Sequence, residues 1–129
     1  MTKLHDNISP LDSRYATKIE SARLIFSEAN LIKIRFEIEI DWLVYLCKKL
    51  PNKFPNISNN SLKKILNFKN SFNEKSVSAI KKIELKTNHD VKAVEYYIRD
   101  FFLKDKVLSK YINLIHFGLT SEDLNSLSY

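Results

Sequence analysis

The sequence predicts an all-α protein, and three observations support this fold class. Glycine occurs once in 129 residues, at Gly118, and the three prolines are Pro10, Pro51 and Pro55. Two long stretches therefore lack both residues that most often interrupt a helix. Apolar residues recur at helical spacing along most of the chain, and capping signals precede several of these stretches. The length is that of about one domain.

The first element expected is one long helix over residues 24–50. Apolar and charged residues alternate between positions 32 and 42, a pattern that by itself is typical of a half-buried strand. However, Lys33 with Glu37 and Arg35 with Glu39 are pairs of opposite charge four residues apart, as neighbours on a helix are. No hairpin turn lies nearby to give a strand its partner. The helix is therefore favoured.

Three further helices are expected after a loop at residues 51–60, which is rich in Pro, Asn and Ser. Helical patterns over 61–72 and 75–85, separated by a short polar break, predict a helical hairpin. The polar side chains of residues 87–90 can cap a third helix that begins near Val91. Its apolar stripe contains Val94, Ile98 and Phe101.

The strongest capping signal lies near the end of the sequence. An apolar stretch over 106–117 ends at Gly118, and Thr120 is followed three residues later by Asp123. A Thr with an acid at this spacing is typical of a helix N-terminus. A helix should therefore begin at Ser121. It has only nine residues before the sequence stops, and without its partner helices so short a helix is expected to fray or to pack non-natively.

The composition predicts a cytoplasmic protein without a membrane span. The longest apolar runs, such as residues 42–46, are far shorter than a spanning helix, and the first six residues lack the apolar core of a signal peptide. Cys47 is the single cysteine, so no intrachain disulfide can form, and no Cys/His cluster has the spacing of metal ligands. Neither a metal nor a cofactor is expected.

The charge is unevenly distributed. Lys and Arg number 21 against 15 acidic residues, a net charge of +6. Lysines are frequent between residues 48 and 86, where Glu74 and Glu84 are the only acids. Such a stretch is usually a solvated helical face. The alternative is a self-standing basic helical module that binds nucleic acid or a protein partner, with binding that weakens steeply as salt is added.

Three polar segments, residues 9–15, 87–90 and 116–123, combine a turn or cap with groups that can bind an anion. Helix N-termini at Asp90 and Ser121 present free amides to an anion. Arg14 offers a two-pronged donor for phosphate or carboxylate. From these residues alone, the prediction is a helical domain that can bind an anion.

The same segments resemble the bacterial adenylosuccinate lyase family. The matching stretches are SPLDSRY at 9–15, TNHDVKAVEY at 87–96, IHF at 115–117 and TSEDLN at 120–125. They follow the order of that family's N-terminal region, and their spacing extends the resemblance over nearly all of the chain. Ser13 stands where the family usually has glycine, which bears on the turn that presents Arg14.

The resemblance implies a member of the fumarase/aspartase superfamily. Residues 1–112 would form its N-terminal helical lyase domain, and residues 113–129 the truncated beginning of its central helical domain. Such enzymes are homotetramers that release fumarate by β-elimination, with purine nucleotides as substrates. Adenylosuccinate gives AMP and SAICAR gives AICAR in purine biosynthesis. Neither nucleic acid nor a membrane is an expected partner.

The resemblance also implies seven substrate-binding residues: Arg14, Tyr15, Asn88, His89, Asp90, Thr120 and Ser121. The first two would hold the substrate phosphate, the next three would line the nucleotide and succinyl pocket, and the last two would hold a succinyl carboxylate. The family's acid histidine and base serine lie beyond residue 129. The isolated chain is therefore expected to be inactive, with no more than a supporting role for His89.

The remaining histidines and several aromatic residues are expected to be structural. His116 should pack beside the turn at Gly118, and His5 should belong to a mobile terminus. Cys47 should be a core thiol. Four aromatic residues are likewise expected in the core: Tyr96, Tyr97, Phe101 and Phe102.

Overall fold

The computed structural model describes residues 8–129 and confirms the all-α class, with no strand among these residues. The α-helices are α1 (Glu20–Phe26), α2 (Glu28–Lys49), α3 (Asn59–Asn70), α4 (Glu74–Thr87), α5 (Asp90–Leu103) and α6 (Ser121–Ser128). Short 3₁₀ helices span Pro10–Asp12, Ala16–Ile19 and Ser109–Leu114. The expectations for His5 and for the first six residues concern positions outside the described range.

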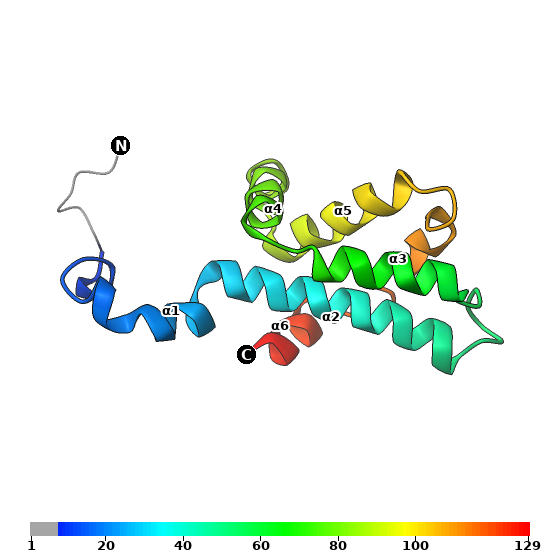
Figure 1. Cartoon of the computed structure of the whole chain (residues 1–129), viewed down its shortest axis with the longest axis horizontal. Helices are drawn as coiled ribbons and strands as arrows, with labels where there is room; N and C mark the ends of the chain where they lie inside the picture. The colour runs from blue at the N-terminus through cyan, green and yellow to red at the C-terminus, as the bar shows by residue number, and fades with distance from the viewer. Residues whose placement is uncertain (1–7) are drawn as a thin grey trace.

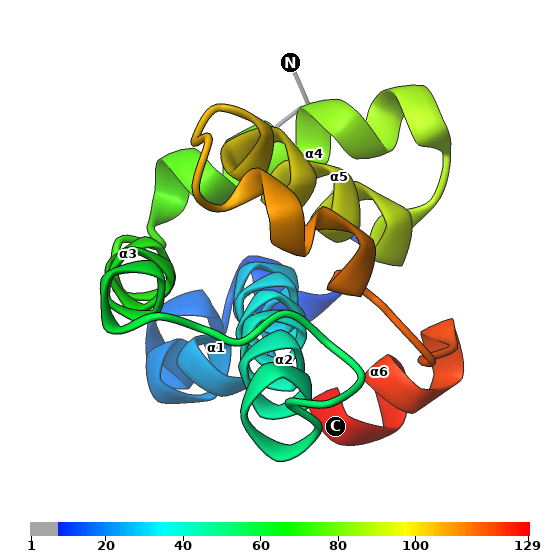
Figure 2. The same ribbon diagram turned by 90° about the vertical axis from the view of Figure 1, so that its right-hand side faces the viewer.

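Helix α2 is the centre of the molecule, with α3, α5 and α6 arranged around it (Figures 1 and 2). One face of α2 is buried, and Phe36 and Ile40 are completely inaccessible to solvent. The ring of Phe36 lies 5.1 Å from that of Phe68 on α3 and 6.0 Å from that of Tyr97 on α5, between ring centroids. The ambiguous alternating segment is therefore helical because the 3.6-residue stripe is the one that finds a core.

The prediction of a single helix over 24–50 is wrong, because the chain breaks at Ser27. This residue is extended, with φ −72° and ψ 153°, and its hydroxyl oxygen accepts a hydrogen bond of 3.2 Å from the Asn30 amide. Serine at an N-cap competes with helix continuation in this way. The segment before the break stands away from the body of the protein (Figure 1), and Phe26 in it is 83% exposed.

The two helices predicted over 61–72 and 75–85 are present as α3 and α4, but the predicted hairpin is wrong, because α3 packs on α2 whereas α4 packs mainly against α5. The hydroxyl oxygen of Ser58 accepts from the Ser61 amide at 3.1 Å and so caps α3. Asn73 caps α4 in a capping box with Ser76. Helix α4 ends at Thr87 and is capped by Asn88, which has the left-handed conformation (φ 50°). Helix α5 begins at Asp90.

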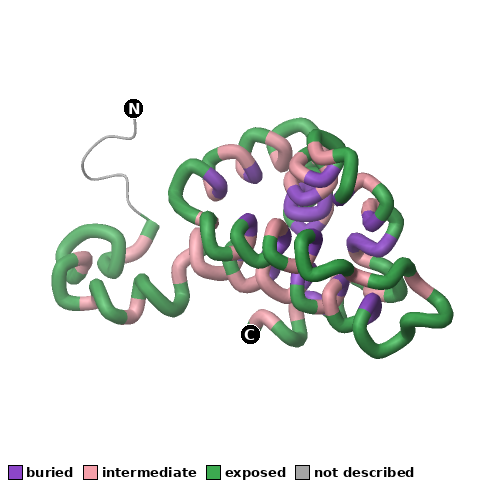
Figure 3. The backbone as a smooth tube through the Cα atoms, turned by 45° about the vertical axis from the view of Figure 1, so that its right-hand side comes forward, coloured by how far each residue is buried: buried purple, intermediate pink, exposed green. Residues whose placement is uncertain are grey.

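Helix α6 begins at Ser121, as predicted. Leu124 is completely buried, and α6 packs along α2. The 3₁₀ helix before it is also fixed, because the buried Tyr111 donates a hydrogen bond of 3.0 Å to the Asn56 carbonyl. Figure 3 shows buried residues gathered where the helices face one another, and an exposed N-terminal arm. None of the helices in residues 8–129 is long and apolar enough to cross a bilayer.

Candidate functional site

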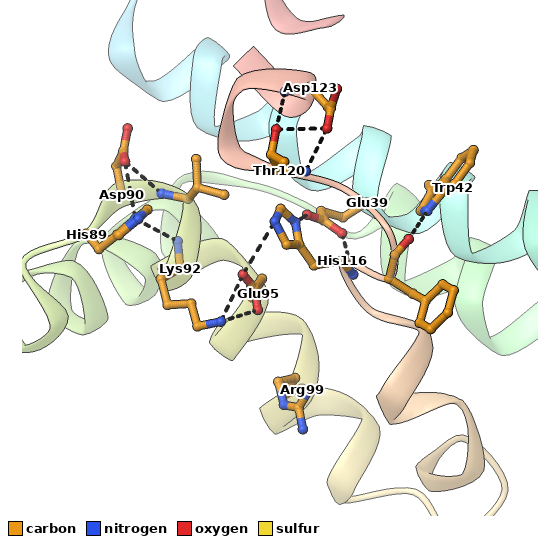
Figure 4. A network of polar contacts seen from close by, with 12 residues as sticks. Glu39, Trp42, His89, Asp90, Lys92, Glu95, Arg99, His116, Thr120 and Asp123 are labelled. Carbon is orange, nitrogen blue, oxygen red and sulfur yellow. Dashed lines mark hydrogen bonds and ion pairs between the residues drawn. The ribbon is translucent and has the colours of Figure 1, made fainter. Parts of the chain in front are cut away.

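An open cavity of about 580 Å³ lies where the start of α5 meets the segment before α6. Its lining residues are Thr87, His89, Lys92, Glu95, Tyr96, His116, Thr120 and Ser121. The fold thus brings together three of the seven predicted site residues, His89, Thr120 and Ser121, from parts of the chain about 30 residues apart. Figure 4 shows His89 and Thr120 of these two segments together with Glu39 and Trp42 of α2.

The turn from α4 to α5 presents His89 to this cavity. Asn88 adopts a positive φ, which Asn tolerates better than most residues, and this reverses the chain between the two helices. His89 is extended, and its Nδ1 accepts a hydrogen bond of 3.3 Å from the Lys92 amide. The residue that caps α5 is therefore His89 itself. The imidazole is half exposed and available to a ligand.

Asp90 is anchored differently from its neighbour. Its Oδ2 accepts a hydrogen bond of 2.7 Å from Nη1 of Arg35, and its Oδ1 accepts one of 2.8 Å from the Val91 amide. Partial burial acts to raise the pKa of Asp90, but the Val91 amide and Arg35 outweigh it and hold the pKa below the ordinary value. Asn88 and Asp90 line a separate hollow beside His89, where Arg35 also lies.

Thr120 closes the N-terminus of α6. Its Oγ1 accepts a hydrogen bond of 3.2 Å from the Asp123 amide, while Oδ2 of Asp123 accepts one of 2.7 Å from the Thr120 amide. This amide and the Thr120 hydroxyl lower the pKa of Asp123. The first amides of α6, beginning with that of Ser121, have no partner within the helix. They are the donors that this wall of the cavity offers to an anion.

His116 is also part of the cavity, and the expectation that it packs beside the Gly118 turn is incomplete. Its Nδ1 lies 2.5 Å from Oε1 of Glu39, and its amide donates to Oε2 of Glu39 at 2.9 Å. On the other side, its Nε2 is 3.9 Å from Oε1 of Glu95 (Figure 4). Burial raises the pKa of Glu39, and the interactions with His116 oppose this rise.

The sequence signal for Glu39 pointed to a different partner. Its spacing from Arg35 suggested an ion pair along the helix, yet both side chains are buried and each has partners on other segments. The neighbouring pair does form, with 3.9 Å between Nζ of Lys33 and Oε1 of Glu37. The available clue in the sequence was that Glu39 stands between two isoleucines, Ile38 and Ile40. A carboxylate that is buried among apolar residues needs a hydrogen-bond or charge partner.

The outer wall of the cavity comes from α5. Nζ of Lys92 lies 2.9 Å from Oε2 of Glu95, so this lysine is partly neutralised. Nζ of Lys92 is also 5.7 Å from the ring centroid of Tyr96. The expectation that Tyr96 belongs to the core is wrong, since it is 41% exposed. The other three aromatic residues of that prediction do belong to the core or pack against it.

Arg14 and Tyr15 are not brought to the cavity. They lie in the turn between the first two 3₁₀ helices and are exposed. The guanidinium of Arg14 is 5.4 Å from the ring centroid of Tyr15. The N-terminal arm that carries both residues stands apart from the helices around α2 (Figure 1).

The chemistry of the cavity is that of a polar pocket with acid–base groups. The imidazole of His89, the hydroxyl of Ser121 and the N-terminus of α6 can donate hydrogen bonds to a carboxylate or phosphate. Within residues 8–129, no three His, Cys, Asp or Glu side chains are arranged to hold a metal ion.

Comparison with known proteins identifies close relatives of this chain. No family model matches it. The chain is 40% identical over 124 residues to a protein of Legionella pneumophila strain Corby named adenylosuccinate lyase. Its identity is 41% over 123 residues to the adenylosuccinate lyase of Haemophilus influenzae and 39% over 123 residues to that of Escherichia coli K12. Each match covers 95% of this chain but 27% of the relative, in its N-terminal portion.

Proposed function

Because this chain is a homologue of the N-terminal portion of adenylosuccinate lyases over 95% of its length, we propose that it supplies that portion of such an enzyme. The reaction is β-elimination, in which a succinyl group leaves a nitrogen as fumarate. The substrates are adenylosuccinate, which gives AMP, and SAICAR, which gives AICAR, in the purine biosynthesis of the cytoplasm.

The observation that carries this proposal is the cavity shared by His89, Thr120 and Ser121. These residues come from two of the segments on which the resemblance rests. The N-terminus of α6, with Thr120 and Ser121, binds a succinyl carboxylate. The free amides and the Ser121 hydroxyl are suitable donors for an anion, whereas the Thr120 hydroxyl donates to Asp123 in this structure. His89 and its neighbours Asn88 and Asp90 line the side of the pocket that takes the nucleotide.

In this proposal Arg14 and Tyr15 hold the substrate phosphate, but in the active site of another chain rather than at the His89 cavity of their own chain. Since the N-terminal arm stands apart from the His89 cavity within one chain, the two halves of a site are completed by different chains. A homotetramer with shared active sites satisfies this requirement. In it, residues 1–112 form the N-terminal helical domain, and residues 113–129 begin the central one.

The 129 residues by themselves do not complete the catalytic machinery. β-Elimination needs an acid for the leaving nitrogen and a base for the carbon-bound proton in one pocket. The cavity offers His89 and His116, whereas the family's acid and its base on a glycine-rich loop have no counterpart in a sequence with one glycine. Its histidines support binding and orientation, and the isolated chain is inactive.

The basic stretch gives less support to the alternative of a nucleic-acid module. Three of its lysines are engaged by acids on other segments. Nζ of Lys64 lies 2.5 Å from Asp105, and Nζ of Lys69 lies 2.6 Å from Asp41. Nζ of Lys81 lies 2.7 Å from Glu28. These pairs reduce the positive charge that the surface can offer to phosphates.

Fumarate release from adenylosuccinate tests the proposed function in two proteins. The first is the 129-residue chain alone, which should release none. The second is a fusion in which this chain replaces the matching N-terminal portion of the Escherichia coli relative, and it should be active. Turnover by the isolated chain that survives repurification would contradict the shared active site. A folded but inactive fusion would count against the lyase function.

A further inference from the structure

Glu39 devotes both of its carboxylate oxygens to a single residue. Oε2 accepts the backbone amide of His116 at 2.9 Å, and Oε1 lies 2.5 Å from Nδ1 of the same residue. The Glu39 side chain is completely buried. Its two partners belong to a residue 77 positions later in the chain, so the contact exists only in the folded protein.

This contact holds His116 in an unusual backbone conformation. His116 has φ 59°, in the left-handed region that costs energy for a residue with a Cβ atom. Residues held in such conformations persist only where their surroundings fix them, and they are frequent at functional sites. Here the fixing group is the Glu39 carboxylate, which binds both the main chain and the side chain of His116.

The other charged groups near His116 leave its second ring nitrogen free. On α5, Oε1 of Glu95 is 3.9 Å from Nε2, too far for a hydrogen bond. Glu95 is bound instead by Lys92, at 2.9 Å. At the start of α6, the carboxylate of Asp123 is used by Thr120. Glu95, Thr120 and His116 all line the cavity, so Nε2 is the ring nitrogen that a ligand there can reach.

We propose that Glu39 is a positioning residue that keeps a proton on Nδ1 of His116 and thereby leaves Nε2 as the nitrogen that meets the ligand. An ionised carboxylate can only accept hydrogen bonds, so the neutral imidazole beside it carries its proton on Nδ1. The orientation of a histidine by a carboxylate at its other nitrogen is a general device of functional sites. Only the identity of the ligand rests on the proposed function, since contacts within this chain determine the tautomer of His116.

Nuclear magnetic resonance of the 129-residue chain, labelled with ¹⁵N in histidine, tests this assignment. Long-range ¹H–¹⁵N correlations distinguish a ring nitrogen that carries a proton from one that does not. In the neutral form of His116, the wild type should show a protonated Nδ1 and a bare Nε2. A neutral ring with its proton on Nε2 would overturn the proposal, whatever the behaviour of any variant.

Glu39→Gln should reverse the tautomer. Glutamine has one acceptor oxygen, which the His116 amide would occupy, and its amide group would then donate to Nδ1 and move the ring proton to Nε2. The matched control is Glu37→Gln, the same change on the same helix at a partly exposed residue that pairs with Lys33. It should leave the His116 signals unchanged.

An unchanged tautomer in a folded Glu39→Gln protein would contradict the positioning role. If this variant does not fold, the wild-type spectrum still decides, because the proton on Nε2 overturns the assignment and the proton on Nδ1 supports it. No substrate or turnover enters the measurement. Failure of the proposed lyase function is therefore distinguishable from failure of this inference.

Discussion

Nη1 of Arg35 on α2 donates a hydrogen bond of 2.7 Å to Oδ2 of Asp90, 55 residues further along the chain. Nη2 of the same side chain donates one of 2.7 Å to Oδ1 of Asn125. A single buried guanidinium thus joins the first residue of α5 to α6. Both helices begin at the wall of the cavity, so this contact sets the spacing of the two N-termini that would bind a substrate.

Replacing Arg35 by Met should lower the free energy of unfolding by about 1–3 kcal/mol. The lower part of this range applies if water reaches Asp90, which is half exposed. Urea unfolding of the 129-residue chain measures the change. Lys33→Met, on the half-exposed side of the same helix, should change stability by less than about 0.5 kcal/mol. Equal losses for the two variants would show that the Arg35 contacts contribute no specific stability.

The free energy of unfolding should decrease as the pH falls, and part of this decrease should come from the protonation of Asp90. Its pKa in the folded chain is below the ordinary value of 3.8, so it stabilises the fold above that pH and loses this contribution as pH falls through the folded pKa. The contribution of Glu39 to stability has the opposite dependence on pH, because burial raises the pKa of Glu39 above 4.5. Its ionisation therefore costs stability as pH rises.

The difference in unfolding free energy between the wild type and Asp90→Asn should therefore be largest near neutral pH and shrink in acid. Denaturant titrations at several pH values between about 2 and 7 measure it. A difference that stays constant over this range would mean that the ionised carboxylate does not stabilise the fold.

The aromatic core around α2 predicts a large effect of one truncation. Phe36 is completely buried and faces the rings of Phe68 and Phe72, so Phe36→Ala should cost about 3–5 kcal/mol. The same substitution at Phe26, which is 83% exposed, should cost no more than about 0.5 kcal/mol. Thermal unfolding followed by circular dichroism compares them. Similar melting temperatures would refute the assignment of Phe36 to the core.

Two substitutions in the active fusion enzyme test the proposed division of the site. Arg14→Ala should remove a phosphate contact of roughly 1.5–3 kcal/mol and raise the Michaelis constant more than it lowers turnover. His89→Ala should act mainly on turnover, because a misplaced reacting group is felt in the transition state. Lys63→Ala, at an exposed residue of α3, is the control and should match the wild type. Wild-type kinetics for Arg14→Ala would remove that residue from the site.

A fifth expectation concerns the isolated chain, because the proposed function requires other chains to complete its site. Calorimetry should detect no micromolar binding of adenylosuccinate to the 129 residues. Micromolar affinity that is abolished by Arg14→Ala would show instead that this domain carries a whole nucleotide site, and the shared pocket would be wrong.

Local sequence patterns were sufficient for the existence of α3, α4, α5 and α6, but not for the break that separates α1 from α2. The capping box of Thr120 and Asp123 placed the start of α6 correctly, and each of the seven predicted site residues lies in a turn or at a helix terminus. Such signals are readable because a cap and its amide are two or three residues apart. The resemblance of the same segments to a lyase family was also visible, since it depends on residue identity and order alone.

Only the tertiary structure determined where the long helix breaks and which residues pair with its buried charged side chains. The break at Ser27 has no glycine or proline to announce it, and serine is compatible with both a helix interior and a cap, so the surroundings made the choice. Likewise, Arg35 and Glu39 looked like partners along one helix, yet they bind Asp90 and His116, 55 and 77 residues away. Burial removes the water that would otherwise satisfy each charge, so each must find a protein partner. Which partner lies within reach is set by how α5 and α6 pack on α2, a relationship that no short stretch of sequence contains.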